Sequence, residues 1–157
     1  MVEKDDPKGM RKGLTRYGDD AFALFLRKSF IKGAGYGDDA LDRLVIGIAD
    51  TGSDFNPCHG NSQELIAQVS AGVLAAGGLP MAFPTISLHE SFAHPTSMYL
   101  RNLMAMDTEE MLKSLPVDAV VLVGGCDKTV PAQVMGALSA NIPLSLIHIS
   151  EPTRLRS

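Results

Sequence analysis

Three successive units, each an apolar run followed by a polar loop and a helical segment, make up most of the sequence. The apolar runs are residues 44–49, 81–86 and 117–123. The first run is continuous, as in a strand buried on both faces, whereas Pro84 weakens the second because proline cannot donate to a strand ladder. Strand–loop–helix units in series predict an α/β fold, with a parallel sheet flanked by helices.

Helical segments follow each of the predicted strands. Asn61 and Glu64 have the spacing of a capping box at the start of the first helix, and Pro131 suits the first turn of the last. Asp107 and Glu110 predict that the helical stretch after the second strand divides in two. The predicted helices cover residues 62–76, 95–106, 107–115 and 131–140.

The remaining sequence predicts an arm and a single domain. Residues 1–20 are polar, which predicts a loosely held N-terminal arm. Residues 21–143 form the predicted α/β domain, which opens with a helix over residues 21–31 because apolar residues recur there at helical spacing.

Residues 144–154 (LSLIHISEPTR) match one translated frame of a common transposase sequencing adapter, which predicts that residues 144–157 derive from an adapter. We therefore expect natural sequence to end near Pro143 and the rest to be extraneous to the fold. The alternative is a genuine strand, because residues 142–149 are rich in apolar and β-branched side chains.

Composition argues against several classes of protein. The 157 residues include 14 basic and 18 acidic side chains, and this net charge of −4 argues against nucleic acid as the main partner. No apolar stretch reaches the roughly 18–20 residues of a membrane span. Residues 1–7 are too polar for a secretion signal, so we expect a cytoplasmic protein. In such a reducing compartment Cys58 and Cys126 predict free thiols or metal ligands.

Side chains that can bind metals follow each predicted strand. Cys58 lies in the first loop, Glu90 in the second, and Cys126, Asp127 and Lys128 in the third. Because ligands bind outside the carboxyl ends of parallel strands, we expect these five residues to meet at one edge of the sheet. Thiolates favour soft metals and carboxylates favour Mg²⁺ or Mn²⁺, so the edge predicts both kinds of metal chemistry.

The ligands of a soft metal are incomplete in this sequence. Two thiols are too few to hold such a centre, so either His59 joins Cys58 and Cys126 or a ligand is missing. Alternatively, Cys58 and His59 form a thiol–imidazole catalytic pair.

The second and third loops also leave alternatives open. His89 and His94 flank Glu90, and each is either a substrate contact or a loop histidine with no part in binding. Lys128 either pairs with Asp127 at the surface, where such a pair contributes little, or has a catalytic or metal-related role.

Three segments of the chain resemble the dihydroxy-acid and sugar-acid dehydratase family. They are residues 54–61 (DFNPCHGN), 84–87 (PTIS) leading to Glu90, and 124–131 (GGCDKTVP). A further segment, residues 89–98 (HESFAHPTSM), is more similar to the pentonate branch, which acts on arabinonate or xylonate, than to the enzyme of branched-chain amino-acid synthesis.

The resemblance implies particular cofactors. Cys58 and Cys126 would be ligands of an iron–sulfur cluster, 2Fe–2S in type, with 4Fe–4S as the variant of some relatives. Glu90, Asp127 and an N-carboxylated Lys128 would bind Mg²⁺. Lys128 and His89 are the catalytic candidates, His89 as a contact to the substrate.

The reaction implied is dehydration of 2,3-dihydroxy carboxylic acids, such as sugar acids, to 2-keto-3-deoxy acids. Members of the family are homo-oligomers and continue for several hundred further residues, which supply a third cluster cysteine, a further acidic metal ligand and a serine base. One alternative is the dihydroxy-acid dehydratase of branched-chain amino-acid synthesis. Another is an inert fragment that associates through the surface its missing part should cover.

Overall fold

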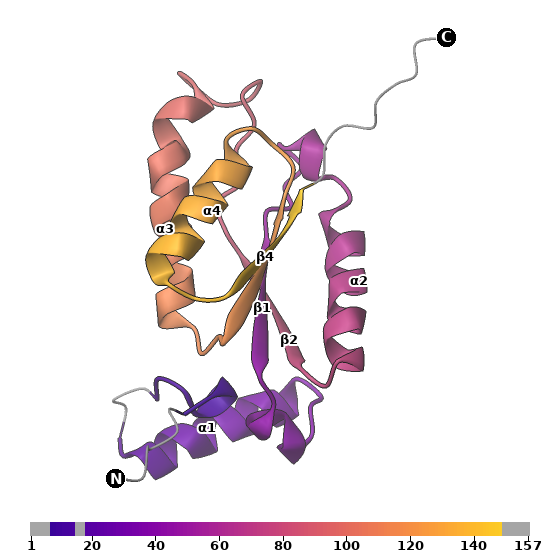
Figure 1. Cartoon of the computed structure of the whole chain (residues 1–157), viewed down its shortest axis with the longest axis vertical. Helices are drawn as coiled ribbons and strands as arrows, with labels where there is room; N and C mark the ends of the chain where they lie inside the picture. Colours follow the sequence, from indigo (N-terminus) through magenta and orange to yellow (C-terminus); the bar gives the residue numbers. More distant parts are fainter. Residues whose placement is uncertain (1–6, 15–17, 149–157) are drawn as a thin grey trace.

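A parallel sheet of four strands forms the centre of the structure, a computed structural model that describes residues 7–14 and 18–148. The strands lie in the order β2-β1-β3-β4 (Figure 1). Their bounds are β1 Val45–Asp50, β2 Leu79–Pro84, β3 Ala119–Gly124 and β4 Leu144–His148. All three neighbouring pairs are parallel, so the predicted α/β fold is confirmed.

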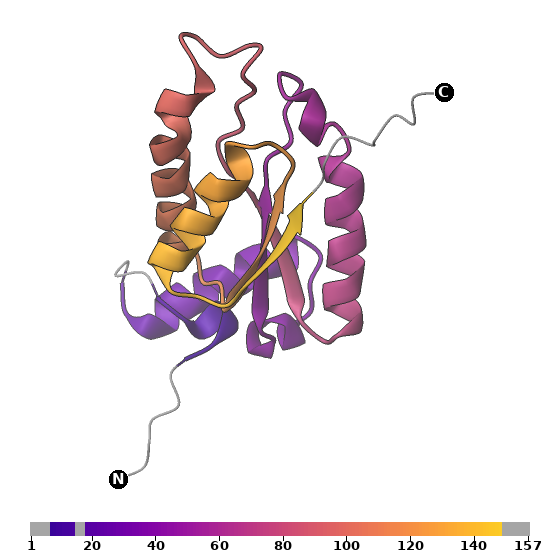
Figure 2. The same ribbon diagram turned by 45° about the horizontal axis from the view of Figure 1, so that its top comes forward.

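Helices cover both faces of this sheet. α2 lies on one face and α3 and α4 on the other, while α1 crosses the end at which the strands begin (Figures 1 and 2). The α-helices are α1 Asp20–Gly33, α2 Ser62–Ala75, α3 Arg101–Ser114 and α4 Thr129–Ala140. The short 3₁₀ turns are η1 Gly9–Arg11, η2 Asp38–Asp42, η3 Pro57–His59 and η4 Ser97–Leu100. None of the helices in the described ranges has the length and apolar character that a membrane span requires.

Alternate residues of the central strands pack into two apolar layers. Ile48 of β1 and Val123 of β3 pack with Ile66 of α2 on one face. Leu122, the neighbour of Val123, packs in the other layer with Ala137 of α4. Because successive strand residues point to opposite faces, the continuous apolar runs serve both layers.

The helices α3 and α4 approach each other closely at Gly136. A Cβ atom at this position would lie 2.4 Å from the carbonyl oxygen of Ala105 in α3. Only glycine fits there without moving the backbone of α3. This close contact holds α3 and α4 together as the layer that packs against β3.

The second strand begins earlier than predicted, at Leu79 instead of residue 81. Leu79 pairs with Val45, and its N–H donates to the carbonyl of Leu44 at 2.8 Å. β2 lies at the edge of the sheet. Pro80 and Pro84 have no N–H to donate, and an edge strand tolerates this because no neighbouring strand on its outer side needs those hydrogen bonds.

The predicted capping box is wrong. α2 begins at Ser62 as expected, but the Asn61 side chain makes no capping hydrogen bond. The 3₁₀ turn η3 leads into the helix, and Asn61 has φ −103° and ψ 13° instead of the extended conformation of a side-chain cap.

The division into two helices between strands β2 and β3 is also wrong. Residues 101–114 form the single helix α3, preceded by the turn η4. Asp107 does not cap a new helix, because its carboxylate accepts a hydrogen bond from the N–H of Ile86 at 2.7 Å. The Asp107 carboxylate, which predicted a break between two helices, instead binds the backbone where the second loop begins.

Part of the predicted loose arm is held against the domain. Met10 is buried with the main core, and Gly9 N–H donates to the Asp118 carboxylate at 2.8 Å. Lys12 Nζ donates to the carbonyl of Val117, and Arg27 donates to the carbonyls of Met10 and Lys12. Residues 7–14 therefore close the core at the amino ends of the strands.

The segment predicted to be extraneous includes strand β4. Leu144–His148 pairs with β3 in parallel register. The pairing needs only apolar residues and a free edge on β3, and is compatible with either origin of the segment.

Candidate metal centre

The loops that follow β1, β2 and β3 meet at one end of the sheet (Figure 2). They surround a hollow of about 190 Å³. Its lining residues are Cys58, Leu88, His89, Glu90, Ser97, Gly125, Cys126, Asp127 and Lys128. The predicted meeting of sulfur and oxygen donors from three loops is therefore confirmed.

The two thiols lie close together with one imidazole. Single donor atoms of Cys58, His89 and Cys126 all lie within 4.8 Å of one another. Both cysteines are half-buried. The imidazole in this group belongs to His89, a residue expected to contact substrate, and not to His59, so of the two alternatives the one in which His59 joins the thiols is not supported.

The environment of Cys126 favours its neutral thiol. Burial, followed by the neighbouring Cys58, raises the pKa of Cys126 well above its usual value. A metal ligand must lose this proton, so a bound cation would take over the stabilisation of the thiolate.

His59, which directly follows Cys58, is buried, with only 1% of its surface exposed. Its Nδ1 lies 2.8 Å from the carbonyl oxygen of Thr51, and its Nε2 lies 2.8 Å from the N–H of Gly125. Both ring nitrogens are therefore occupied by the backbone, and burial lowers the pKa of His59. This arrangement contradicts the Cys58–His59 catalytic pair, because no ring nitrogen is free to take a proton from the thiol.

The second loop fixes Glu90 as a carboxylate. One of its oxygens accepts hydrogen bonds from the Ser97 N–H, the Ser97 hydroxyl and the Thr96 hydroxyl. These bonds, that of the Ser97 hydroxyl foremost, lower the pKa of Glu90 to about 2. Glu90 is therefore a charged oxygen donor at neutral pH, as a hard cation requires.

Asp127 and Lys128, which also line the hollow, form an ion pair. Lys128 Nζ lies 2.8 Å from Asp127 Oδ2, and the lysine side chain is 16% exposed against 78% for the aspartate. The bond to Asp127 raises the pKa of Lys128, although desolvation opposes this shift. The Lys128 side chain is thus largely buried, unlike the lysine of an ordinary surface ion pair.

Sequence reasoning missed the residues that hold these donors. Ser97, which anchors Glu90, is fully buried, and so is Asn56, whose Oδ1 accepts a hydrogen bond from the Cys126 thiol at 3.4 Å. Only the tertiary contacts identify these two residues. His94, the other histidine beside Glu90, is exposed and does not line the hollow.

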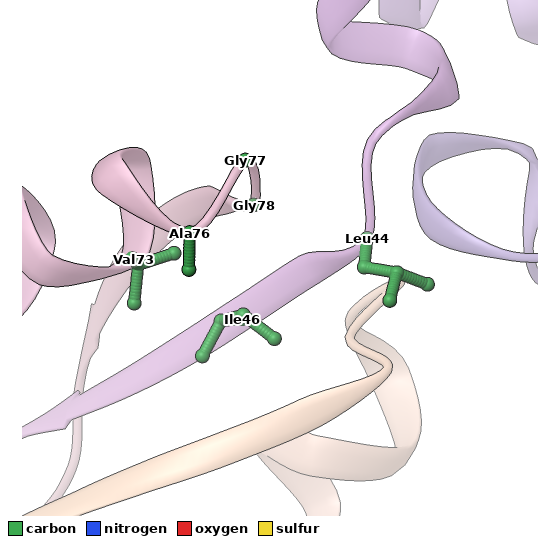
Figure 3. Close-up of a pocket in the computed structure, with 6 residues that line it drawn as sticks. All are labelled: Leu44, Ile46, Val73, Ala76, Gly77 and Gly78. Atoms are coloured by element: carbon green, nitrogen blue, oxygen red, sulfur yellow. The ribbon is translucent and has the colours of Figure 1, made fainter.

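A second hollow lies at the other end of β1 and has a different character. Its volume is about 280 Å³ and its lining is apolar (Figure 3). The lining residues are Leu44, Ile46, Val73, Ala76, Gly77 and Gly78. None of them can bind a metal or move a proton, so the larger hollow is not the site of chemistry.

Comparison with known proteins assigns the chain to a class of enzyme. The N-terminal region of the dihydroxy-acid/6-phosphogluconate dehydratases matches residues 43–150, and the chain belongs to this family. Members of the family are dehydratases, that is, hydro-lyases. The family resemblance predicted from the three loop motifs is confirmed.

Individual relatives point to one branch of the family. The chain is 43% identical over 124 residues to the L-arabonate dehydratase of Azospirillum brasilense, covering 78% of this chain and 21% of the relative. It is 41% identical over 124 residues to the D-xylonate dehydratase of Caulobacter vibrioides, covering 79% and 21%. Identity to the dihydroxy-acid dehydratase of Clostridium botulinum is 36% over 126 residues, covering 77% and 23%. The chain is thus more similar to the pentonate branch, and it spans about a fifth of the length of these relatives.

Proposed function

We propose that this chain is the metal-binding N-terminal part of a dehydratase that converts sugar acids, in particular pentonates, into 2-keto-3-deoxy acids. The observation that carries the proposal is the meeting of Cys58, His89 and Cys126 in one hollow with Glu90, Asp127 and Lys128. The identity to the arabonate and xylonate dehydratases, higher than that to the dihydroxy-acid dehydratase, supports sugar acids as the substrate class.

In this proposal Cys58 and Cys126 hold an iron–sulfur cluster, of the 2Fe–2S type, with 4Fe–4S as the alternative. The donors fit such a group, because two half-buried thiols lie within 4.8 Å of each other and sulfur suits iron. These two residues leave positions for further ligands, which we assign to sequence beyond this chain.

Glu90, Asp127 and Lys128 hold Mg²⁺ in the same proposal. Glu90 and Asp127 supply carboxylate oxygens, and carboxylation of Lys128 Nζ would convert a cation into a third oxygen donor. Carboxylation needs the neutral amine, which the bond to Asp127 disfavours. Metal binding by Asp127 would remove that obstacle.

The residues of this chain divide the work between binding and orientation. When bound, the cluster and the magnesium ion would supply Lewis acidity at the departing hydroxyl and at the substrate carboxylate. His89, within 4.8 Å of both thiols, contacts the substrate on the cluster side. We assign the catalytic base to sequence beyond this chain.

The test uses the full-length gene product, purified without oxygen. We expect it to contain iron and acid-labile sulfide and to dehydrate L-arabinonate or D-xylonate faster than a branched 2,3-dihydroxy acid. Cys58→Ser and Cys126→Ser should each lose the iron. A folded, iron-free protein would contradict the cluster proposal, and a preference for the branched acid would move the chain to the other branch.

A second proposal concerns the 157-residue chain by itself: it is catalytically inert and self-associates. Phe55 and Phe92, which pack edge to face at 5.9 Å, remain 69% and 61% exposed beside His89. Exposed apolar surface of this kind favours association. Size-exclusion chromatography should show species larger than a monomer, and Phe92→Ser should reduce them; a monodisperse monomer would contradict the proposal.

A further inference from the structure

The buried imidazole of His59 joins the two loops that carry the thiols. His59 directly follows Cys58, and its Nε2 binds the N–H of Gly125, which directly precedes Cys126. The two bonded residues are 66 positions apart in the sequence. The ring is therefore a cross-link between the backbones on which both sulfur atoms depend.

The hydrogen bonds also fix the tautomer of this ring. The carbonyl oxygen of Thr51 only accepts, so Nδ1 carries the hydrogen, and the N–H of Gly125 only donates, so Nε2 presents its lone pair. A protonated imidazole could not accept from Gly125. The neutral Nδ1–H form is thus the one that satisfies both backbone groups, and the Asn56 amide nitrogen, 3.0 Å from Nδ1, then has the Ser87 hydroxyl as its acceptor.

Asn56 extends the same connection to the loop after β2. Its Nδ2 donates to the Ser87 hydroxyl at 3.0 Å, while its Oδ1 accepts from the Cys126 thiol. Asn56 and His59 are 0% and 1% exposed, so neither side chain can exchange these partners for water. An unsatisfied polar group at this depth would destabilise the loop arrangement.

We infer that His59 is a positioning residue, which sets the separation of the Cys58 and Cys126 thiols through the Gly125 amide and is neither a metal ligand nor a base. The inference rests on the proposed function only in treating the two thiols as ligands of one metal group. The spacing itself is a property of this chain without any metal.

The experiment measures thiol spacing in the 157-residue chain with phenylarsine oxide. This reagent forms two As–S bonds with a close pair of thiols, and the two thiol protons leave with the arsenic-bound oxygen as water. We expect His59→Ala to weaken capture of the arsenical about tenfold, because the second thiol loses effective concentration. His59→Gln, whose side-chain oxygen can still accept from Gly125 N–H, should remain near wild type.

Two controls separate positioning from stability. Asn61→Ala changes a side chain of the same loop that makes no capping bond, and should leave capture unchanged. Asp118→Ala removes hydrogen bonds at the far end of the sheet, so it should lower stability without weakening capture. Wild-type capture by a folded His59→Ala protein, or failure of a folded His59→Gln protein to restore capture, would overturn the inference.

A measurement on the wild-type protein removes the dependence on folded variants. Nitrogen-15 NMR should show the Nδ1–H tautomer at His59 and slow exchange of the Gly125 amide proton. An Nε2–H tautomer or a freely exchanging Gly125 amide would overturn the inference without any substitution. Absence of iron from the full-length protein would instead defeat the proposed function and leave these results intact.

Discussion

The two ends of the sheet are held by different kinds of contact. At the end where the strands begin, Asp118 Oδ2 accepts hydrogen bonds from the N–H groups of Gly9 and Val45, each at 2.8 Å, and Met10 and Ile31 close the apolar core. At the end where the strands finish, the uncharged and buried Asn56 and His59 connect loops whose charged residues face a hollow.

This difference separates stability from function. Contacts at the amino end satisfy backbone groups and seal the core, and they present no cluster of metal-binding donors there among the described residues. At the carboxyl end, buried hydrogen bonds hold the loops in position relative to one another. Substitutions at the first end should therefore change folding, and those at the second should change ligand binding.

The largest expected effect is on both ends together. Leu122 is fully buried in β3, between the two ends. Its replacement by alanine should destabilise the protein by about 2–5 kcal/mol, because it leaves a cavity in the core. Urea unfolding followed by circular dichroism measures this loss. A loss below about 1 kcal/mol would show that β3 does not form the shared core.

Asp118→Ala should separate the two ends. It leaves the N–H of buried Val45 without its acceptor, so we expect a loss of about 1–3 kcal/mol in unfolding free energy. Capture of phenylarsine oxide by the folded protein should be unchanged. A parallel loss of thiol capture would show that the ends are coupled and that the comparison fails.

The sequence predicted the scaffold well because apolar runs and turn residues are local signals. The errors arise where a side chain is used by a distant partner: Asp107 resembled a helix cap but binds the Ile86 N–H, and His59 resembled a ligand but binds Gly125. Neither partner can be identified from neighbouring residues. The donors themselves were predictable, since the carboxyl ends of parallel strands bring their loops to one edge.

Glu90→Gln should affect the other end alone. The amide oxygen can still accept from Ser97 and Thr96, so unfolding free energy should change little. Loss of the negative charge should weaken Mn²⁺ binding to the full-length protein at least about tenfold. Electron paramagnetic resonance of free Mn²⁺ measures this, with Glu110→Gln, on the exposed surface of α3, as the matched control. Equal affinity in the two variants would remove Glu90 from the metal site.

The smallest effect is expected at Lys12. Its Nζ donates to the Val117 carbonyl at 2.8 Å, and Lys12→Met removes that bond while keeping the apolar stem. We expect a loss of about 0.5–1.5 kcal/mol in unfolding free energy, with unchanged thiol capture. Lys8→Met, at an exposed position of the same segment, is the control. Equal stability of the two variants would show that the segment contributes nothing through Lys12.

The most direct test of the metal centre is iron K-edge X-ray absorption on the full-length protein prepared without oxygen. The account predicts an iron environment dominated by sulfur with a second iron as neighbour, and loss of this signal in Cys58→Ser and Cys126→Ser. Iron surrounded by oxygen and nitrogen alone, or a sulfur signal that survives both substitutions, would contradict it.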